Sequence, residues 1–178
     1  MDRADVLIIM DGSLAGAVAC AMECERGHTI VAWLPPPRSG LRAPDLGAVD
    51  AARAERLVRE QAELHAVGEL IISAPDGARA DPSMLLLDAA RAAGARAAAR
   101  VVWPVARGDS VDAMYRVTER ADLATRLARL DAEDRAESGP GVRIETPFVD
   151  LTHDQLLDLA RDLEICEETW VGRQGIRR

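Results

Sequence analysis

Short, continuous apolar runs alternate with helix-like segments along the first part of the chain, and this alternation constrains the fold more than any other feature. The apolar runs cover residues 6–10, 29–34, 70–72 and 98–102. The segments between them have helical spacing and cover residues 14–26, 48–67 and 82–93. Strands that are apolar throughout are typical of a parallel sheet covered on both faces. Right-handed crossovers then predict a doubly wound, Rossmann-like α/β sandwich with helices on both faces.

The remainder of the chain predicts more helix and one further extended segment. Residues 110–136 carry apolar side chains three and four positions apart, so we expect one long amphipathic helix, or two with a break, in a helical segment at about 108–138. An extended segment at 142–148 and a helix that begins with a Thr152–Gln155 capping box make up a C-terminal unit at 142–170. No linker or repeat divides the chain, so we predict a single domain over 1–178.

Composition excludes several kinds of chemistry. All 22 basic residues are Arg, and the absence of Lys excludes a Walker-type phosphate loop and Schiff-base catalysis. The net charge of -8 disfavours a nucleic-acid partner. Cys20 and Cys24 share a helix face without a neighbouring His, so we interpret them as small buried hydrophobic residues. The sequence shows no signal segment and no membrane span, so we expect a cytoplasmic protein without a membrane partner.

The turn Asp11-Gly12-Ser13, directly after the first predicted strand, is the natural candidate for a ligand site. Ligands of doubly wound sheets bind beyond the carboxyl ends of the strands. A helix N-terminus there offers unpaired N–H groups and a positive dipole end to a phosphate, and Gly12 permits close approach. The alternative is a plain strand-to-helix turn with Ser13 or Asp11 as the N-cap. Arg38, in the loop after the second strand, is either an anion clamp or a solvated surface side chain.

Two longer segments resemble the PP-loop ATPases, and specifically the 7-cyano-7-deazaguanine synthases of queuosine precursor synthesis. Residues 6–34, VLIIMDGSLAGAVACAMECERGHTIVAWL, resemble that family's first strand, its Ser-Gly-Gly-x-Asp-Ser loop, an Ala-rich helix and a second strand. Residues 145–170, ETPFVDLTHDQLLDLARDLEICEETW, resemble its Pro-hydrophobic-hydrophobic-x-Leu-(Ser/Thr)-Lys-x-Glu segment with the helix that follows. Residues 66–77 resemble its third strand. The resemblance implies an adenine nucleotide alpha hydrolase-like fold and a site for ATP or AMP with Mg²⁺.

The sequence departs from that family at the positions that define its site. In the loop, Gly12 is retained, Asp11 stands at the first Ser, Ser13 at the second Gly and Gly16 at the last Ser. His153 stands where the family has Lys. The family's zinc-binding Cys cluster has no counterpart, so we expect no metal site.

These observations support three functional hypotheses. The leading one is a degenerate PP-loop protein, more a pseudoenzyme than an enzyme, that acts as a binding or assembly protein and forms a homodimer through its helical segment at about 108–138. The second is an active ATP-dependent, adenylate-forming ligase or amidotransfer-type enzyme on a carboxylate or deazapurine-like substrate. In that enzyme backbone N–H groups of the loop would hold phosphate and His153 would replace the missing cation. The third is a small-molecule sensor that binds its ligand at the same site, beyond the carboxyl ends of the strands. The predicted site residues are Asp11, Gly12, Ser13, Gly16, Arg38 and His153.

Overall fold

The fold alternates strands and helices, as the sequence predicts. The computed structural model describes residues 4–36, 41, 51–73, 81–134 and 141–165. In this part of the chain the elements are β1 (Val6–Ile9), α1 (Leu14–Glu25), β2 (Ile30–Leu34), α2 (Ala51–Leu64), β3 (Glu69–Ile72), α3 (Pro82–Gly94), β4 (Arg100–Val102), α4 (Val111–Asp134), β5 (Arg143–Glu145) and α5 (His153–Asp162).

The strands form one parallel sheet in the order β3-β2-β1-β4-β5. Every neighbouring pair is parallel, and Leu7 at the centre is in register with Val31 on one side and Val101 on the other. The chain builds outward from β1 to β3 and then returns to the opposite side of β1 to form β4. This topology confirms the predicted doubly wound fold, and its reversal of direction lies between β1 and β4, where such sheets bind their ligands.

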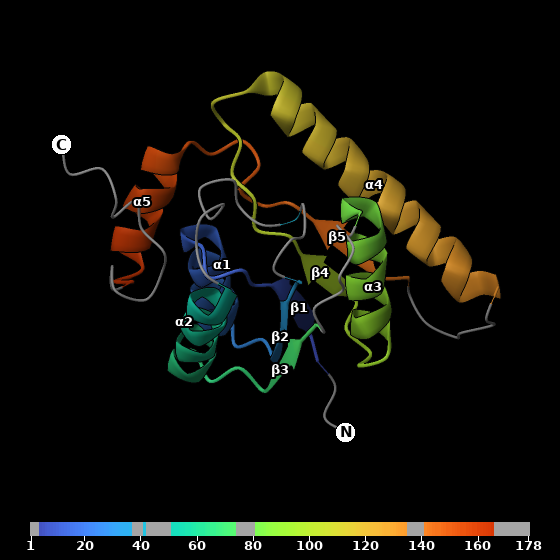
Figure 1. Ribbon diagram of the computed structural model, residues 1–178, viewed down its shortest axis with the longest axis horizontal. Coiled ribbons are helices and arrows are strands. Elements are labelled where there is room, and N and C mark those ends of the chain that lie inside the picture. The colour runs from blue at the N-terminus through green and yellow to red at the C-terminus, as the bar shows by residue number, and fades with distance from the viewer. Residues whose placement is uncertain (1–3, 37–40, 42–50, 74–80, 135–140, 166–178) are drawn as a thin grey trace.

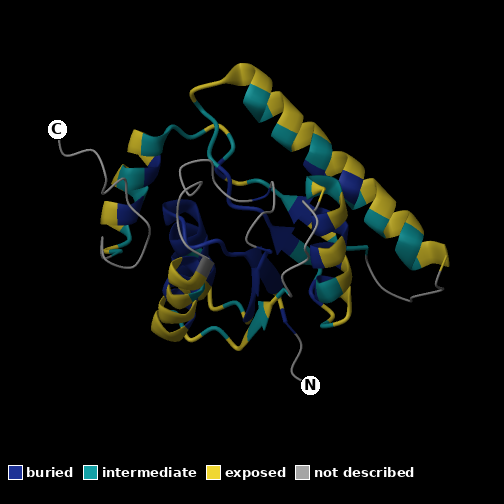
Figure 2. Cartoon of the chain, in the orientation of Figure 1, coloured by how far each residue is buried: buried dark blue, intermediate teal, exposed yellow. Residues whose placement is uncertain are grey.

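Helices cover both faces of the sheet. Figure 1 shows α1, α2 and α5 on one side and α3 with the long α4 on the other. Residues of β1 alternate between the two cores: Val6 and Ile8 pack on the α1 side, and Leu7 and Ile9 on the α3 side. Each large aliphatic side chain buried in this way stabilises the fold by roughly 1.5–3 kcal/mol. Figure 2 shows the buried strands at the centre and the exposed outer faces of the helices.

Helix α1 is enclosed because its side chains are small. Most of its residues from Leu14 to Ala21 are Ala or Gly and all are buried, so the sheet, α2 and α5 can all approach it. Cys20 fits the interpretation as a small buried residue, but Cys24 is exposed and there the prediction was wrong. Cys24 lies one helix turn beyond Cys20, near the end of α1, and only Cys20 packs into the core on this side of the sheet. The close packing of α5 on α1 brings the first residues of the two helices to the same end of the molecule.

Several element boundaries differ from those that the sequence predicts. The helix predicted at 48–67 is α2, which ends at Leu64, and residues 48–50 lie outside the described part. The extended segment predicted at 142–148 is a strand only over Arg143–Glu145, because Pro147 cannot donate to a sheet and the chain turns over residues 147–150. Within the helical segment predicted at about 108–138, residues Val111–Asp134 form one unbroken helix, α4, and residues 135–138 lie outside the described part.

The structure also differs from the sequence prediction at strand β3 and at the C-terminal end of helix α3. The apolar run at 70–72 predicts a strand covered on both faces, but β3 is an edge strand whose first and last residues, Glu69 and Ile72, are exposed. Glycine often ends a helix, so the sequence predicts Gly94 as the cap of α3, but Gly94 is the last helical residue and the left-handed conformation falls on Ala97 (φ 58°). Among the described helices, none combines the length and the apolar character that crossing a bilayer would require.

Candidate functional site

The turn between β1 and α1 is shaped by Gly12. Its φ of 83° lies in the left-handed region, where side chains other than Gly are strained. A Cβ on Gly12 would also lie 3.3 Å from the backbone oxygen of Ala54 on α2. The turn therefore needs glycine for its backbone conformation and for its approach to α2.

Two side chains of the turn already use backbone donors that a phosphate would need. The N–H of Ser13 donates to Asp11 Oδ1 at 2.9 Å, and the N–H of Gly16 donates to Ser13 Oγ at 3.3 Å. Both side chains are buried, with 6% of Asp11 and 6% of Ser13 exposed. Ser13 is thus the N-cap of α1, which decides between the two N-cap residues that the sequence left open.

The next two amides of α1 remain available. Within the described part of the chain, the N–H groups of Leu14 and Ala15 donate to no protein atom. Both residues line a hollow of about 210 Å³ at the start of α1. Unpaired N–H groups at a helix N-terminus, together with the positive end of the helix dipole, attract an anion.

The loop after β4 forms the opposite wall of this hollow. Arg107 N–H donates to Val149 O at 3.0 Å, and Gly108 N–H donates to Leu151 O at 2.9 Å. A Cβ on Gly108 would lie 2.5 Å from the backbone oxygen of Asp150, so the two loops can approach this closely only at a glycine. The contact ties the loop after β4 to the loop that leads into α5.

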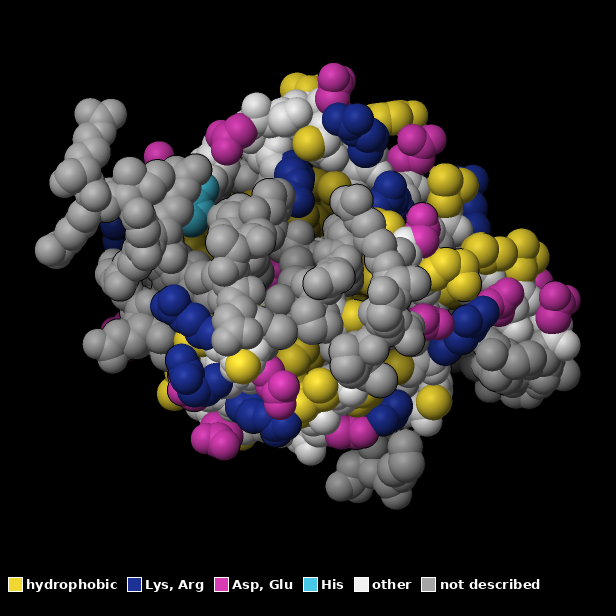
Figure 3. Space-filling model, viewed as in Figure 1, with side chains coloured by type: hydrophobic (Ala, Val, Ile, Leu, Met, Phe, Trp, Pro, Cys, Tyr) yellow, Lys and Arg dark blue, Asp and Glu magenta, His cyan; other side chains and the backbone are white. Residues whose placement is uncertain are grey.

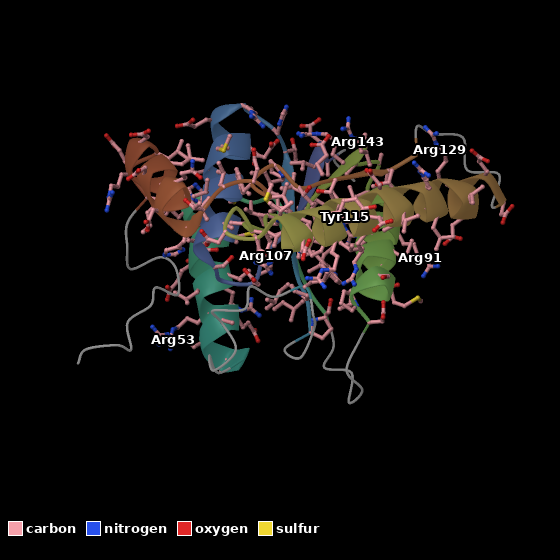
Figure 4. All side chains as sticks on the ribbon, turned by 90° about the horizontal axis from the view of Figure 1, so that it is seen from above. Arg53, Arg91, Arg107, Tyr115, Arg129 and Arg143 are labelled. Atoms are coloured by element: carbon pink, nitrogen blue, oxygen red, sulfur yellow. The ribbon has the colours of Figure 1, made fainter. Side chains whose placement is uncertain are left out.

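Arg107 and His153 place two cationic or ionisable side chains at the hollow. His153 is the first residue of α5, where Thr152 and Gln155 form the predicted capping box: Gln155 N–H donates to Thr152 Oγ1 at 3.3 Å and Thr152 N–H to Gln155 Oε1 at 2.8 Å. The guanidinium of Arg107 donates to the Ala106 oxygen at 2.7 Å. Figure 4 shows Arg107 between α1 and the first turn of α4.

The hollow thus lies between the carboxyl ends of β1 and β4, at the point where the strand order reverses. Its polar lining is mixed in charge, since Asp109 lies beside Arg107, Ser110 and His153. The residues that line it are Ser13, Leu14, Ala15, Leu41, Pro104, Val105, Ala106, Arg107, Asp109, Ser110, Leu151, His153 and Leu156.

The hollow unites some of the predicted site residues and omits others. Ser13 and His153, far apart in the sequence, both line it. Asp11, Gly12 and Gly16 shape the turn behind Ser13 but are not part of the lining. Arg38 lies outside the described residues.

Sequence reasoning missed the whole segment from Pro104 to Ser110. The predicted site residues come from the turn after the first strand and the start of its helix, the loop after the second strand and the start of the last helix, whereas the loop after β4 supplies much of the lining. The available signal was the position of that loop directly after the fourth apolar run. It becomes decisive only when the strand order shows that β4 lies next to β1.

A second cluster of charged side chains lies around Glu23, near the opposite ends of the strands. The buried Glu23 carboxylate accepts from Arg100 at 2.7 Å and from Arg26 at 2.6 Å, and lies 2.6 Å from His28 Nδ1. Burial raises the pKa of Glu23, but hydrogen bonds from His28 and Arg100 outweigh it and hold that pKa below its usual value. Arg100 also pairs with Glu145, so the cluster ties α1 to β4 and β5.

No metal centre is formed by the residues that the structure describes, since no three His, Cys, Asp or Glu side chains converge there. His28 belongs to the Glu23 cluster. His65, at the end of α2, is half-buried, and this burial lowers its pKa. Cys20 is held as a thiol, because burial raises its pKa to about 12.

Comparison with solved structures identifies the fold. The U34-tRNA thiolase NcsA from Methanococcus maripaludis, determined with its 4Fe-4S cluster, aligns with a TM-score of 0.55 and 13% identity over 92% of this chain and 58% of the thiolase. NMN synthetase from Francisella tularensis aligns with a TM-score of 0.42 and 14% identity, over 93% of this chain and 64% of the synthetase. No protein-family model and no curated protein matches the sequence.

The five-stranded parallel sheet with helices on both faces is therefore a Rossmann-like fold that matches the fold of the thiolase. This chain spans less than two thirds of either aligned protein. The fold agrees with the fold that the sequence resemblance implied, whereas identity this low leaves the activity to be argued from the site itself.

Proposed function

We propose that this chain is a PP-loop-type protein with a degenerate loop, which binds a small ligand through one phosphate or carboxylate group and does not turn over ATP. The Asp11 carboxylate is the observation that carries the proposal. It is buried in the turn and accepts the Ser13 N–H at 2.9 Å. At this position the family that the sequence resembles has a hydroxyl. The carboxylate thus brings negative charge to the place where that family would hold pyrophosphate.

Electrostatics favour a small anion over a triphosphate. Two like unit charges about 6 Å apart repel by about 3 kcal/mol at an effective dielectric constant of about 20. ATP carries about four negative charges, so the Asp11 carboxylate opposes it more strongly than it opposes a monoanion or dianion. Asp109 places a carboxylate in the lining of the hollow itself.

The donors around the hollow suit a single anionic group. The N–H groups of Leu14 and Ala15, at the start of α1, meet the side chains of Arg107, from the loop after β4, and His153, at the start of α5, at one hollow. Charge-assisted hydrogen bonds of this kind contribute about 1.5–3 kcal/mol each. The hollow of about 210 Å³ is smaller than the roughly 300–1,000 Å³ typical of sites for drug-sized ligands. We therefore assign it to one anionic group with a small organic part.

The proposal is tested by assaying turnover and binding on the same preparation. With ATP and Mg²⁺, we expect no release of AMP or pyrophosphate above the rate without protein. With AMP or inorganic phosphate as the titrant, Arg107→Ala and His153→Ala should each weaken binding about tenfold. The matched control is Arg53→Ala, because Arg53 is exposed on α2, away from the hollow. Protein-dependent formation of AMP and pyrophosphate from ATP would overturn the proposal and favour the adenylate-forming enzyme.

Rebuilding the loop tests whether the loop sequence limits ATP binding. A variant that restores Ser-Gly-Gly-x-Asp-Ser over residues 11–16 removes the carboxylate from position 11 and adds one at position 15, so the single variant Asp11→Ser isolates the role of Asp11. Space allows a side chain at the last position, since a Cβ on Gly16 would lie 3.8 Å from its nearest neighbours. In Asp11→Ser, relief of about 3 kcal/mol of repulsion should raise ATP affinity at least about tenfold, and the full rebuild should raise it as well. An unchanged affinity for ATP in both variants would show that the loop does not limit binding.

A further inference from the structure

A row of exposed leucines runs along the long helix α4. Leu123, Leu127 and Leu130 are 57%, 46% and 55% exposed. Their spacing of four and three residues places them on one face of the helix. Figure 3 shows hydrophobic side chains gathered on the right of the molecule, where α4 lies. Apolar surface concentrated on one helix face marks an interaction site rather than the scatter of single exposed residues that soluble proteins tolerate.

The leucines border a groove between α3 and α4. The groove has a volume of about 340 Å³, and α3 contributes Ser83 and Leu87 to its wall. Leu123 and Leu127 line it from α4, together with Ala124. The leucine row is thus the edge of a depression that can receive side chains from another helix.

The charges on this face are distributed unequally along α4. Arg116 and Arg120 precede the leucines, and Asp134 follows them at the end of the helix. Positions 116, 120, 123, 127, 130 and 134, which we call the α4 seam, alternate in steps of four and three. This is the spacing of residues at the contact between two paired helices. One end of the seam is cationic, its centre is apolar and its other end is acidic.

We propose that the α4 seam is the contact surface for a second copy of this chain, with the two α4 helices antiparallel. A twofold axis between Leu123 and Leu127 sets each of these leucines opposite the other in the partner copy. The same axis sets Arg116 of one copy opposite Asp134 of the other, and this contact occurs twice. A surface that complements itself about a twofold axis is what an isologous dimer requires.

Charge excludes the parallel arrangement of the same helices. In a parallel pair, Arg116 would face Arg116 and Asp134 would face Asp134, so that both ends of the seam would repel. In the antiparallel pair, the positive N-terminal end of each helix dipole also lies beside the negative C-terminal end of the other, which is favourable. The proposal does not depend on the ligand of the hollow, because the seam uses none of the residues that line it.

The mass of the full-length chain in solution provides the first test. By sedimentation equilibrium at about 100 µM chain, the wild-type protein should have twice the 19.2 kDa mass of the single chain. Leu127→Glu should give the single-chain mass with an unchanged far-ultraviolet circular dichroism spectrum. The matched control is Leu64→Glu, at a 60% exposed leucine of α2 outside the seam, which should stay dimeric. A wild-type protein of single-chain mass, or a dimer that survives Leu127→Glu, would overturn the proposal.

Charge reversal tests the antiparallel geometry. Arg116→Glu alone and Asp134→Arg alone should each weaken the dimer about tenfold, because each places like charges at both ends of the seam. An equimolar mixture of the two variants should recover wild-type affinity as mixed dimers, in which both end contacts are again between opposite charges. Native mass spectrometry distinguishes mixed dimers from homodimers. A mixture that dimerises no better than its components would overturn the antiparallel assignment.

Discussion

Replacing Gly108 with Ala should destabilise the protein by about 3 kcal/mol and disturb the hollow. The added Cβ would lie 2.5 Å from the oxygen of Asp150 and 2.6 Å from Leu151 C and Thr152 N. All three are backbone atoms, so they cannot rotate away as a side chain could. Overpacking of this kind costs about 1–3 kcal/mol. Separating the loops would also lose the hydrogen bond from Gly108 N–H to Leu151 O, for about 1 kcal/mol more.

Thermal unfolding followed by circular dichroism measures this effect. In a chain of this length, 1 kcal/mol shifts Tm by about 2–4 °C, so Gly108→Ala should lower Tm by about 6–12 °C. The control is Gly94→Ala, in which the new Cβ makes an ordinary 3.7 Å contact with Val142 and the helix gains a better helix former. Its Tm should equal or exceed that of the wild type. If Gly108→Ala unfolds within about 2 °C of the wild type, the two loops are not held together as described.

Three further predictions concern other parts of the fold. Glu23→Gln should destabilise the protein by about 3 kcal/mol at neutral pH, because it removes the buried carboxylate that accepts charge-assisted hydrogen bonds from Arg100 and Arg26. The pKa of Glu23 is lowered on folding, so its contribution to stability is present above pH 4.5 and is lost as pH falls through the folded-state pKa. Chemical unfolding should therefore show that the free energies of unfolding of the variant and the wild type converge in acid. With Cys166 replaced by Ser, iodoacetamide at about pH 8 should label the exposed Cys24 and spare Cys20. Because the pKa of Cys20 is about 12, only a fraction of about 10⁻⁴ of its thiol is ionised at that pH. Equal labelling of the two residues, measured by mass spectrometry, would contradict the burial of Cys20. Thr152→Ala should cost about 1 kcal/mol by removing the capping box, and no change in the free energy of unfolding would show that the cap is dispensable.

The fold was largely predictable because its information is local. Apolar runs such as 6–10 and 29–34 differ in period from the helices between them, and this difference predicts a parallel sheet. The capping box at Thr152 was predictable for the same reason, since its partner Gln155 is three residues away. The edge position of β3 was not, because exposure of Glu69 and Ile72 depends on which strands pair with β3, and no local pattern specifies that.

The candidate site was predictable only in part, because it is assembled from distant segments. Ser13 follows a strand and starts a helix, so its position at a rim could be inferred from the sequence. Arg107 and Gly108 carry no local signal: their roles come from contacts with residues 149–151, which only the packed structure reveals. The resemblance aligned His153 with a cationic position, and the structure places it at the same hollow as Ser13.

Isothermal titration calorimetry with AMP and with ATP and Mg²⁺ tests most directly whether the hollow holds one anionic group in place of a triphosphate. We expect AMP to bind with a Kd of about 0.1–1 mM, ATP to bind at least about tenfold more weakly, and Asp11→Ser to reduce this difference. Micromolar binding of ATP by the wild-type protein, equivalent to about -8 kcal/mol, would refute a site for a single anionic group. That result would mean that the loop with Asp11 holds a triphosphate.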